Sequence, residues 1–247
     1  MRQADTRSRR FRAVVLDYGG VLSYGPSPRE IELLSRSFRV TPARFEPAYN
    51  RARGLYDRGD LSITEYWSGI GRESGIKLTP VLLERLGRAD REMWGRVNPQ
   101  MRDWFEKLRR AGYRTALLSN MPSDMIAHVR ENFTWLASFD HQILSAEVRL
   151  VKPDPAIFQL CLDRLDVRAP EAIFVDDNKE NVAGAQSLGF ATILFRSVAR
   201  LRRDLESIGF RPLPTGQHSV PTRADSGQDN GSARLSPAFK VRTKRDF

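Results

Sequence analysis

Four short polar clusters stand out in this chain of 247 residues, because each one directly follows a hydrophobic run or lies in one. They supply a carboxylate, a hydroxyl beside an amide, a lysine, and a pair of adjacent carboxylates. Gathered at one place, such groups could bind a phosphate with the help of magnesium, a cation that prefers oxygen ligands. In chain order the clusters are Asp17, Ser119 with Asn120, Lys152, and Asp176 with Asp177.

The first cluster joins a carboxylate to a glycine turn. Asp17 ends the apolar run 13–16 and is followed two residues later by Gly19 and Gly20. A carboxylate in this position could attack phosphorus and form an aspartyl-phosphate, or it could bind magnesium. The two glycines would let the backbone approach a phosphate or a metal closely.

The other three clusters could complete such a site. A hydroxyl and backbone N–H groups at Ser119 and Asn120 suit phosphate oxygens. The ammonium of Lys152 could neutralise negative charge on the phosphate and on the attacking group. The neighbouring carboxylates of Asp176 and Asp177 repel each other unless a cation compensates, and magnesium is the cation that we expect.

The apolar runs in front of the clusters are typical of strands that are buried on both faces. Segments with helical spacing of apolar residues separate these runs. The alternation predicts an α/β protein with a Rossmann-like, doubly wound parallel sheet, in which ligands bind at the carboxyl ends of the strands. The predicted strands are 13–16, 115–118, 143–144, 173–175 and 192–195.

A long segment after the first strand has a different character. Residues 24–97 carry apolar side chains at helical spacing and contain no convincing strand, so we predict an inserted, all-helical cap domain. Its aromatic and basic side chains, Arg51, Arg53, Tyr56 and Trp67, are better explained by packing and solvation than by contact with a substrate. The Rossmann-like catalytic core would then comprise residues 13–23 and 98–210.

The net charge of +10 is concentrated in the two ends of the chain. Residues 1–12 hold five arginines and one aspartate, which makes a basic N-terminal tail. Residues 211–247 hold seven basic and three acidic residues, and their composition predicts a disordered C-terminal tail. Because the basic excess lies in tails, we expect no specific nucleic-acid partner.

The remaining composition points to an ordinary reducing compartment. The single cysteine, Cys161, cannot form a disulfide within the chain. No run approaches the roughly 18 apolar residues that a membrane span needs. We therefore predict a cytoplasmic protein, a monomer or homodimer, with a small phosphorylated metabolite as its partner and no membrane partner.

Taken together, the motifs resemble those of the haloacid dehalogenase (HAD) superfamily of hydrolases. The resemblance covers about residues 13–200 and is closest to subfamily IA, which has a helical C1 cap, and to bacterial sugar-1-phosphate phosphatases. The motifs that carry it are Val15-Leu16-Asp17-Tyr18-Gly19-Gly20-Val21-Leu22, Leu117-Leu118-Ser119-Asn120, Val151-Lys152-Pro153-Asp154 and Phe174-Val175-Asp176-Asp177-Asn178.

This resemblance implies a magnesium-dependent phosphatase that hydrolyses a small phosphate monoester, with sugar phosphates among the candidates. Asp17 would be the catalytic nucleophile and a metal ligand. The substrate-binding residues would be Ser119, Asn120 and Lys152. The magnesium ligands would be Asp17, the carbonyl of Gly19, Asp177 directly and Asp176 through water, although the last two could exchange roles.

One departure from the family pattern leaves alternatives open. Most phosphatases of this superfamily carry a second Asp two residues after the nucleophile, as general acid and then base, but this chain has Gly19 there. Loss of a general acid typically lowers the rate by about 10²- to 10⁴-fold. The chain could be a phosphatase that favours good leaving groups. It could also be a metal-independent 2-haloacid dehalogenase, although the carboxylate pair Asp176 and Asp177 argues against this alternative. A third alternative is a non-catalytic phosphate-binding regulatory protein.

Overall fold

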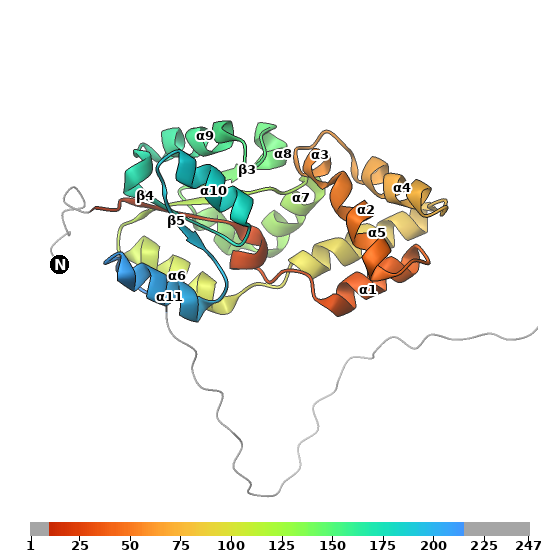
Figure 1. Cartoon of the computed structure of the whole chain (residues 1–247), viewed down its shortest axis with the longest axis horizontal. Coiled ribbons are helices and arrows are strands. Elements are labelled where there is room, and N and C mark those ends of the chain that lie inside the picture. Colours follow the sequence, from red (N-terminus) through yellow and green to blue (C-terminus); the bar gives the residue numbers. More distant parts are fainter. Residues whose placement is uncertain (1–9, 215–247) are drawn as a thin grey trace, which may run out of the picture. The chain divides into compact units, whose positions relative to one another are not determined.

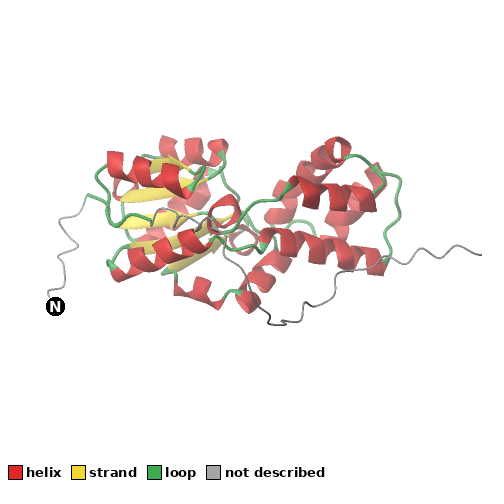
Figure 2. Cartoon of the chain, turned by 90° about the horizontal axis from the view of Figure 1, so that it is seen from below, coloured by secondary structure: helices red, strands yellow, loops and turns green. Residues whose placement is uncertain are grey.

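The computed structural model describes residues 10–214, and its centre is a five-stranded parallel sheet with the order β3-β2-β1-β4-β5. This arrangement confirms the predicted Rossmann-like α/β fold (Figure 2). Leu16 on β1 pairs with Leu117 on β2 and with Val175 on β4, so the three strands end at the same edge of the sheet. The strands are β1 (Ala13–Leu16), β2 (Arg114–Ser119), β3 (His141–Leu144), β4 (Ala172–Asp176) and β5 (Ala191–Leu194).

Helices cover both faces of this sheet (Figure 1). Because side chains alternate along a strand, Leu16 packs in a cluster with Trp104 on one face, while Val15 packs in a cluster with Phe158 on the other. The helices outside the long insertion are α6 (Pro99–Arg110), α7 (Ser123–Asn132), α8 (Ser145–Val148), α9 (Pro155–Leu165), α10 (Lys179–Ser187) and α11 (Val198–Ser207), with short helical turns η2 (Tyr18–Leu22), η3 (Thr134–Ser138) and η4 (Ala169–Glu171).

Between η2 and α6 the chain is helical throughout, and we refer to residues 24–97 as the helical insert. The two ends of the insert run side by side, since Ser23 and Val97 form an antiparallel bridge and the N–H of Asn98 donates to the carbonyl of Leu22 at 2.8 Å. The insert comprises α1 (Pro28–Ser37), α2 (Pro42–Arg51), α3 (Arg53–Asp57), α4 (Ile63–Glu73) and α5 (Pro80–Trp94).

The insert has an aromatic core of its own, in which the rings of Phe38 and Trp67 stack with their centroids 6.1 Å apart. By their contacts, however, the described residues fall into one unit together with the sheet. The boundary between a catalytic core and a cap domain therefore stays a prediction. None of the helices within residues 10–214 has the length and apolar character needed to cross a membrane.

Some residues that the sequence assigns to the two tails contact the folded part of the chain. Phe11 is buried and meets the ring of Phe210 edge to face, with the centroids 6.0 Å apart. The indole N–H of Trp104 donates to the carbonyl of Pro212 at 3.0 Å. Phe11 and Pro212 therefore contact the folded part of the chain, although the sequence assigns them to the tails. The outer part of each tail lies outside the described residues.

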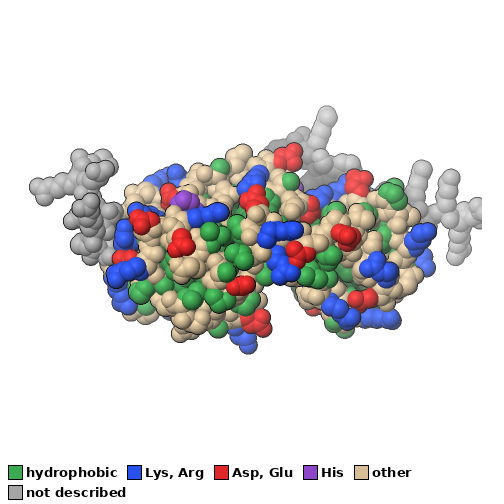
Figure 3. Space-filling view, turned by 90° about the horizontal axis from the view of Figure 1, so that it is seen from above, with side chains coloured by type: hydrophobic (Ala, Val, Ile, Leu, Met, Phe, Trp, Pro, Cys, Tyr) green, Lys and Arg blue, Asp and Glu red, His purple; other side chains and the backbone are tan. Residues whose placement is uncertain are grey.

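Charged side chains are mixed on the face of the molecule in Figure 3, where Lys and Arg alternate with Asp and Glu. Several of these charges form exposed ion pairs within one helix, such as Arg36 with Glu32 and Arg200 with Asp204. Exposed pairs of this kind contribute at most about 1 kcal/mol each. The absence of a specific nucleic-acid partner stays a prediction.

Candidate active site

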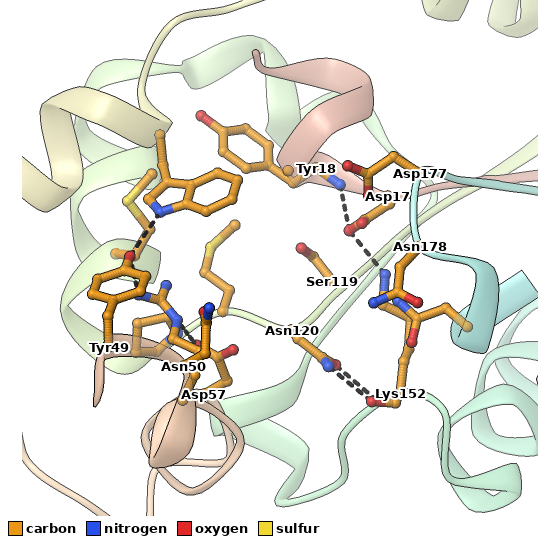
Figure 4. A pocket seen from close by; sticks show the side chains of 17 residues that line it. Asp17, Tyr18, Tyr49, Asn50, Asp57, Ser119, Asn120, Lys152, Asp177 and Asn178 are labelled. Atoms are coloured by element: carbon orange, nitrogen blue, oxygen red, sulfur yellow. Dashed lines mark hydrogen bonds and ion pairs between the residues drawn. The ribbon is translucent and has the colours of Figure 1, made fainter. Parts of the chain in front are cut away.

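A cavity of about 260 Å³ lies at the carboxyl ends of the strands and is roofed by the helical insert. The side chains of Asp17, Ser119, Lys152 and Asp177 line its floor. Figure 4 shows Tyr49, Asn50 and Asp57 of the insert across the cavity from Asp17 and Asp177. The lining residues supplied by the insert are Tyr49, Asn50, Arg53, Asp57 and Trp94.

Lys152 lies at the centre of the floor and is buried between two carboxylates. Its Nζ is 2.9 Å from Oδ1 of Asp17 and 2.7 Å from Oδ2 of Asp176. The same ammonium donates to the carbonyl of Leu118 at 2.8 Å. Burial alone would lower the pKa of Lys152, but the two carboxylates outweigh it and the pKa is raised. The lysine is thus a fixed, permanently charged group.

The two carboxylates of this triple have different environments. Oδ1 of Asp17 also accepts from the N–H of Tyr18 at 2.7 Å, and Oδ2 has no hydrogen bond within residues 10–214. Burial raises the pKa of Asp17 to about 7, against the opposing effect of Lys152. Asp176 is fully buried, and besides Lys152 it accepts from the N–H of Asn178 and from the amide of Asn181.

A third carboxylate, that of Asp177, stands beside this triple. One oxygen from each of Asp17, Asp176 and Asp177 can be chosen so that all three lie within 4.8 Å of one another. Desolvation and the charge of Asp176 raise the pKa of Asp177, and no ion pair to its side chain occurs among the residues described. Three carboxylates therefore face one buried ammonium, that of Lys152, and Arg196, which donates to the main-chain carbonyl of Asp177 at 3.2 Å, offsets part of the charge of Asp177. The site is left with surplus negative charge.

The glycine turn makes room for the side chain of Asp177, whereas the sequence predicts only that these glycines let the backbone approach a phosphate or a metal. Gly20 has φ +71°, a backbone conformation that favours glycine. A Cβ atom at this position would lie 2.0 Å from Oδ2 of Asp177. Gly19 is crowded from the other side, where a Cβ atom would lie 3.0 Å from the ring of Trp94.

The loop after β2 holds Lys152 in place through Asn120. The side-chain amide of Asn120 donates to the carbonyl of Lys152 at 2.9 Å and accepts from its N–H at 2.8 Å. Since Oδ1 and one of the two amide hydrogens are occupied, Asn120 could offer a phosphate its second amide hydrogen and its backbone N–H. The hydroxyl of Ser119 lines the cavity and has no hydrogen bond to another described residue.

The structure thus brings the site residues predicted from the sequence to one cavity wall, except for Asp176, which is fully buried next to Lys152. It also adds Asn181, which orients Asp176, and the roof residues Asp57 and Trp94, together with Arg53, whose side chain the sequence assigns to packing rather than to the site. A sequence signal for Asn181 exists, because it follows the acidic pair at helical spacing. The roof residues have no comparable signal, because their contact with the cavity depends on how five helices fold back.

An open parallel sheet that gathers carboxylates, a hydroxyl and a buried lysine at the carboxyl ends of its strands, under an inserted helical roof, is the architecture of an α/β hydrolase. A family model described as haloacid dehalogenase-like hydrolase matches residues 11–189, and the chain belongs to this family.

Similar curated proteins cover several activities. The chain is 29% identical to mouse (Mus musculus) acyl-CoA dehydrogenase family member 10 over 228 residues, which are 87% of this chain and 21% of that protein. It is 37% identical to (S)-2-haloacid dehalogenase 1 of a Pseudomonas strain over 86 residues, 35% of this chain and 38% of that protein. It is 26% identical to sesquiterpene phosphatase astK of Aspergillus oryzae over 184 residues, 72% of this chain and 87% of that protein. The matched part thus spans less than two fifths of the first two relatives.

Two solved structures illustrate the shared fold. A HAD family enzyme from Bacteroides thetaiotaomicron, in complex with magnesium and inorganic phosphate, is 24% identical and superposes with a TM-score of 0.63 over 75% of this chain and 94% of its own. A HAD-like hydrolase from Porphyromonas gingivalis is 23% identical and has a TM-score of 0.62 over 86% of this chain and 96% of its own.

We expect Gly20→Ala to destabilise the fold, because the new methyl group would combine a strained φ with a collision against Asp177. Strain of this kind amounts to about 1–3 kcal/mol, to be measured by urea unfolding. Gly25→Ala is the matched control, since a Cβ atom at Gly25 meets nothing within 4 Å. Equal stability of the two variants would contradict the assigned role of Gly20.

We expect Asp17→Asn to stabilise the protein in EDTA at pH 8 and to have little effect at pH 4. The pKa of Asp17 is raised from 3.8 to about 7 in the fold, so the native state favours the protonated form and stability falls as the pH rises through this interval. Each pKa unit corresponds to about 1.4 kcal/mol. Urea unfolding at several pH values tests this, and a wild type that is more stable than the variant at pH 8 would disprove it.

Proposed function

We propose that this HAD-like hydrolase is a magnesium-dependent phosphatase that acts on a small phosphate monoester through an aspartyl-phosphate at Asp17. The observation that carries the proposal is the surplus negative charge of the floor, where Asp17, Asp176 and Asp177 face one buried cation, Lys152, and Arg196 offsets only part of the charge of Asp177. A divalent cation would balance this charge, and a site for halide displacement has no need of a third carboxylate.

The donor set fits magnesium. The side chain of Asp177 accepts no hydrogen bond from another described residue, so it is suited to direct ligation together with Asp17 and the carbonyl of Gly19. Both oxygens of Asp176 are engaged by Lys152, Asn178 and Asn181, so Asp176 is better suited to a contact through water. When bound, the cation would offset the charge that the phosphoryl group brings into the site.

The side chains of the floor would then have separate roles in the reaction. Oδ2 of Asp17 would attack phosphorus, while Oδ1 is held by Lys152 and by the N–H of Tyr18. Lys152 and the hydroxyl of Ser119 would bind oxygens of the transferring phosphoryl group. Asn120 would contribute by fixing the loop that carries Lys152 and through its backbone N–H.

The comparisons support this proposal without deciding the substrate. One relative that matches along most of its length is named a sesquiterpene phosphatase, and one solved neighbour was crystallised with magnesium and inorganic phosphate. A cavity of about 260 Å³ suits a small ester, with sugar phosphates among the candidates.

Dehalogenation of 2-haloacids is the second candidate. It is favoured by the 37% identity to a named dehalogenase over 86 residues, the highest among the relatives described above. In this chemistry Asp17 would attack carbon and a halide ion would leave, so that no proton donor at position 19 is required. Dehalogenation, however, does not explain why the site contains the additional carboxylate of Asp177.

The first test measures phosphate release from p-nitrophenyl phosphate and from a panel of metabolite phosphates. We expect turnover that EDTA removes and magnesium restores, and that Asp17→Asn abolishes while the circular dichroism spectrum is retained. Chloride release from 2-chloropropionate in EDTA would select the dehalogenase instead. Phosphate binding without either reaction would indicate a non-catalytic regulatory protein.

The second test compares the two adjacent carboxylates. Asp177→Asn should raise the magnesium concentration needed for half-maximal activity at least about tenfold, with little change in stability. Asp176→Asn should lower the stability by about 3–5 kcal/mol, because it leaves Lys152 with a weaker buried partner. The opposite assignment of the two effects, read from magnesium titrations and urea unfolding, would show that Asp176 is the direct ligand.

A further inference from the structure

A charged cluster forms the roof of the cavity, opposite the phosphate-binding floor. Arg53 is its cation, and it contacts two carboxylates. Nε of Arg53 donates to Oδ1 of Asp57 at 2.9 Å, and NH1 of Arg53 lies 3.3 Å from Oδ2 of Asp90. Both aspartates are buried. One guanidinium therefore faces two carboxylates, and a proton on one of them would remove the surplus charge.

The two carboxylates differ in how fully they are satisfied. Oδ1 of Asp90 accepts from the hydroxyl of Tyr49 at 2.5 Å while Oδ2 faces Arg53, and Asp90 does not line the cavity. Asp57 does line it, and its Oδ2 has no hydrogen bond within the described part of the chain. The proton is therefore best placed on Asp57, where it can face the cavity.

The charges around Asp57 agree with this assignment. Burial raises the pKa of Asp57, Arg53 opposes the rise, and Asp90 and Asp124 add to it. The hydroxyl of Ser145 donates to the main-chain carbonyl of Asp57 and thereby fixes the residue without neutralising its side chain. The groups that face Asp57 from the surrounding elements are Arg53 (α3), Asp90 (α5), Tyr66 (α4), Asp124 (α7) and Ser145 (α8).

The place where a second carboxylate could stand beside Asp17 is already filled. A Cβ atom at Gly19 would lie 3.0 Å from Cζ3 and 3.4 Å from Cε3 of Trp94. With the insert packed in this way, the ring of Trp94 takes the space that a longer side chain at position 19 would need. A proton donor for the leaving group must therefore come from another part of the cavity wall.

Tyr18 is a competing donor that the geometry disfavours. Its hydroxyl is buried without a hydrogen-bond partner among residues 10–214, and Tyr18 lines the cavity. Figure 4 shows this hydroxyl pointing away from Asp17 and Ser119, however. Asp57 instead lies across the cavity from Asp17, on the side where a leaving group would depart after in-line attack.

We propose that Asp57, supplied by the helical insert, is the general acid and base that this chain uses in place of a second aspartate at position 19. The proposal rests on the phosphatase function proposed above. In the first step Oδ2 of Asp17 would form a bond to phosphorus, the bond from phosphorus to the ester oxygen would break, and the carboxyl proton of Asp57 would pass to that oxygen.

The second step restores the enzyme. A water molecule would attack phosphorus and give a proton to the carboxylate of Asp57, while the bond between phosphorus and Asp17 breaks. The products are an alcohol and inorganic phosphate, and both aspartates return to their starting forms. Gly19 implies a preference for good leaving groups. With Asp57 acting in this way, that preference would be weak in the wild type and pronounced in a variant that lacks the Asp57 carboxyl group.

The test compares Asp57→Asn with the wild type on two magnesium-dependent substrates of different leaving-group acidity. For p-nitrophenyl phosphate, whose leaving group needs no proton, kcat/KM, which reports the first step alone, should change less than about threefold. For an alkyl phosphate such as glycerol 1-phosphate, kcat/KM should fall by about 10²- to 10⁴-fold. Equal losses on both substrates, or no loss on either, would overturn the assignment.

Asp90→Asn is the matched control, because it removes the other carboxylate from Arg53 and Asp90 does not itself line the cavity. It should keep the leaving-group dependence of the wild type. It should also move the alkaline limb of the kcat/KM profile for the alkyl phosphate to lower pH, since Asp90 helps to raise the pKa of Asp57. The pH profile of Asp57→Asn should lack the alkaline limb.

The wild-type profile provides a measurement that does not depend on the folding of a variant. The alkaline limb should appear with the alkyl phosphate and be absent with p-nitrophenyl phosphate, and its presence with both substrates would contradict the role of Asp57. A wild type that releases phosphate from p-nitrophenyl phosphate upholds the phosphatase proposal whatever Asp57 does. A wild type that hydrolyses neither ester overturns both proposals.

Discussion

The site depends on one buried ion triple, in which Lys152 lies between Asp17 and Asp176. Its ammonium also donates to the carbonyl of Leu118, so a single side chain ties together the ends of β1, β2 and β4. Buried ions lose much of their hydration, and the attraction between them often only offsets that loss. The triple is therefore better understood as a device that specifies geometry than as a source of stability.

The surroundings of the triple are arranged around its charge. Asn120 and Asn181 hold Lys152 and Asp176 through uncharged amides, so they add orientation without altering the charge balance. The glycine at position 20 then admits Asp177, which makes the floor more negative. A fold selected for stability alone would avoid this crowding, and such local conflicts are expected where a binding site has been built.

Much of this could be predicted from the sequence, because a strand buried on both faces is a continuous apolar run and the residue that follows it is at the sheet edge. That reasoning found β1, β2 and β4, and with them Asp17 and Asp176. It could not decide how Asp176 and Asp177 divide their tasks, because this depends on which carboxylate Lys152 and Asn181 reach. It also assigned Phe11 to a tail, since no local pattern shows that a lone aromatic side chain will pack on the base of a sheet.

The residues of the roof could not be predicted from the sequence in this way, because contacts between the insert and the part of the fold that contains the sheet place them over the cavity. The hydroxyl of Ser145 donates to the main chain of Asp57, and Asp124 accepts from the hydroxyl of Tyr56 at 2.5 Å and from Arg91 at 3.2 Å. Each contact joins a side chain of the floor's scaffold to the insert. A displaced insert would lose these contacts and would withdraw Asp57 and the ring of Trp94 from the cavity together. When the insert docks, Trp94 would exclude water and Asp57 would be placed to deliver a proton at the same time. The chemistry at Asp17 is thereby linked to the packing of residues that are far from it in the chain.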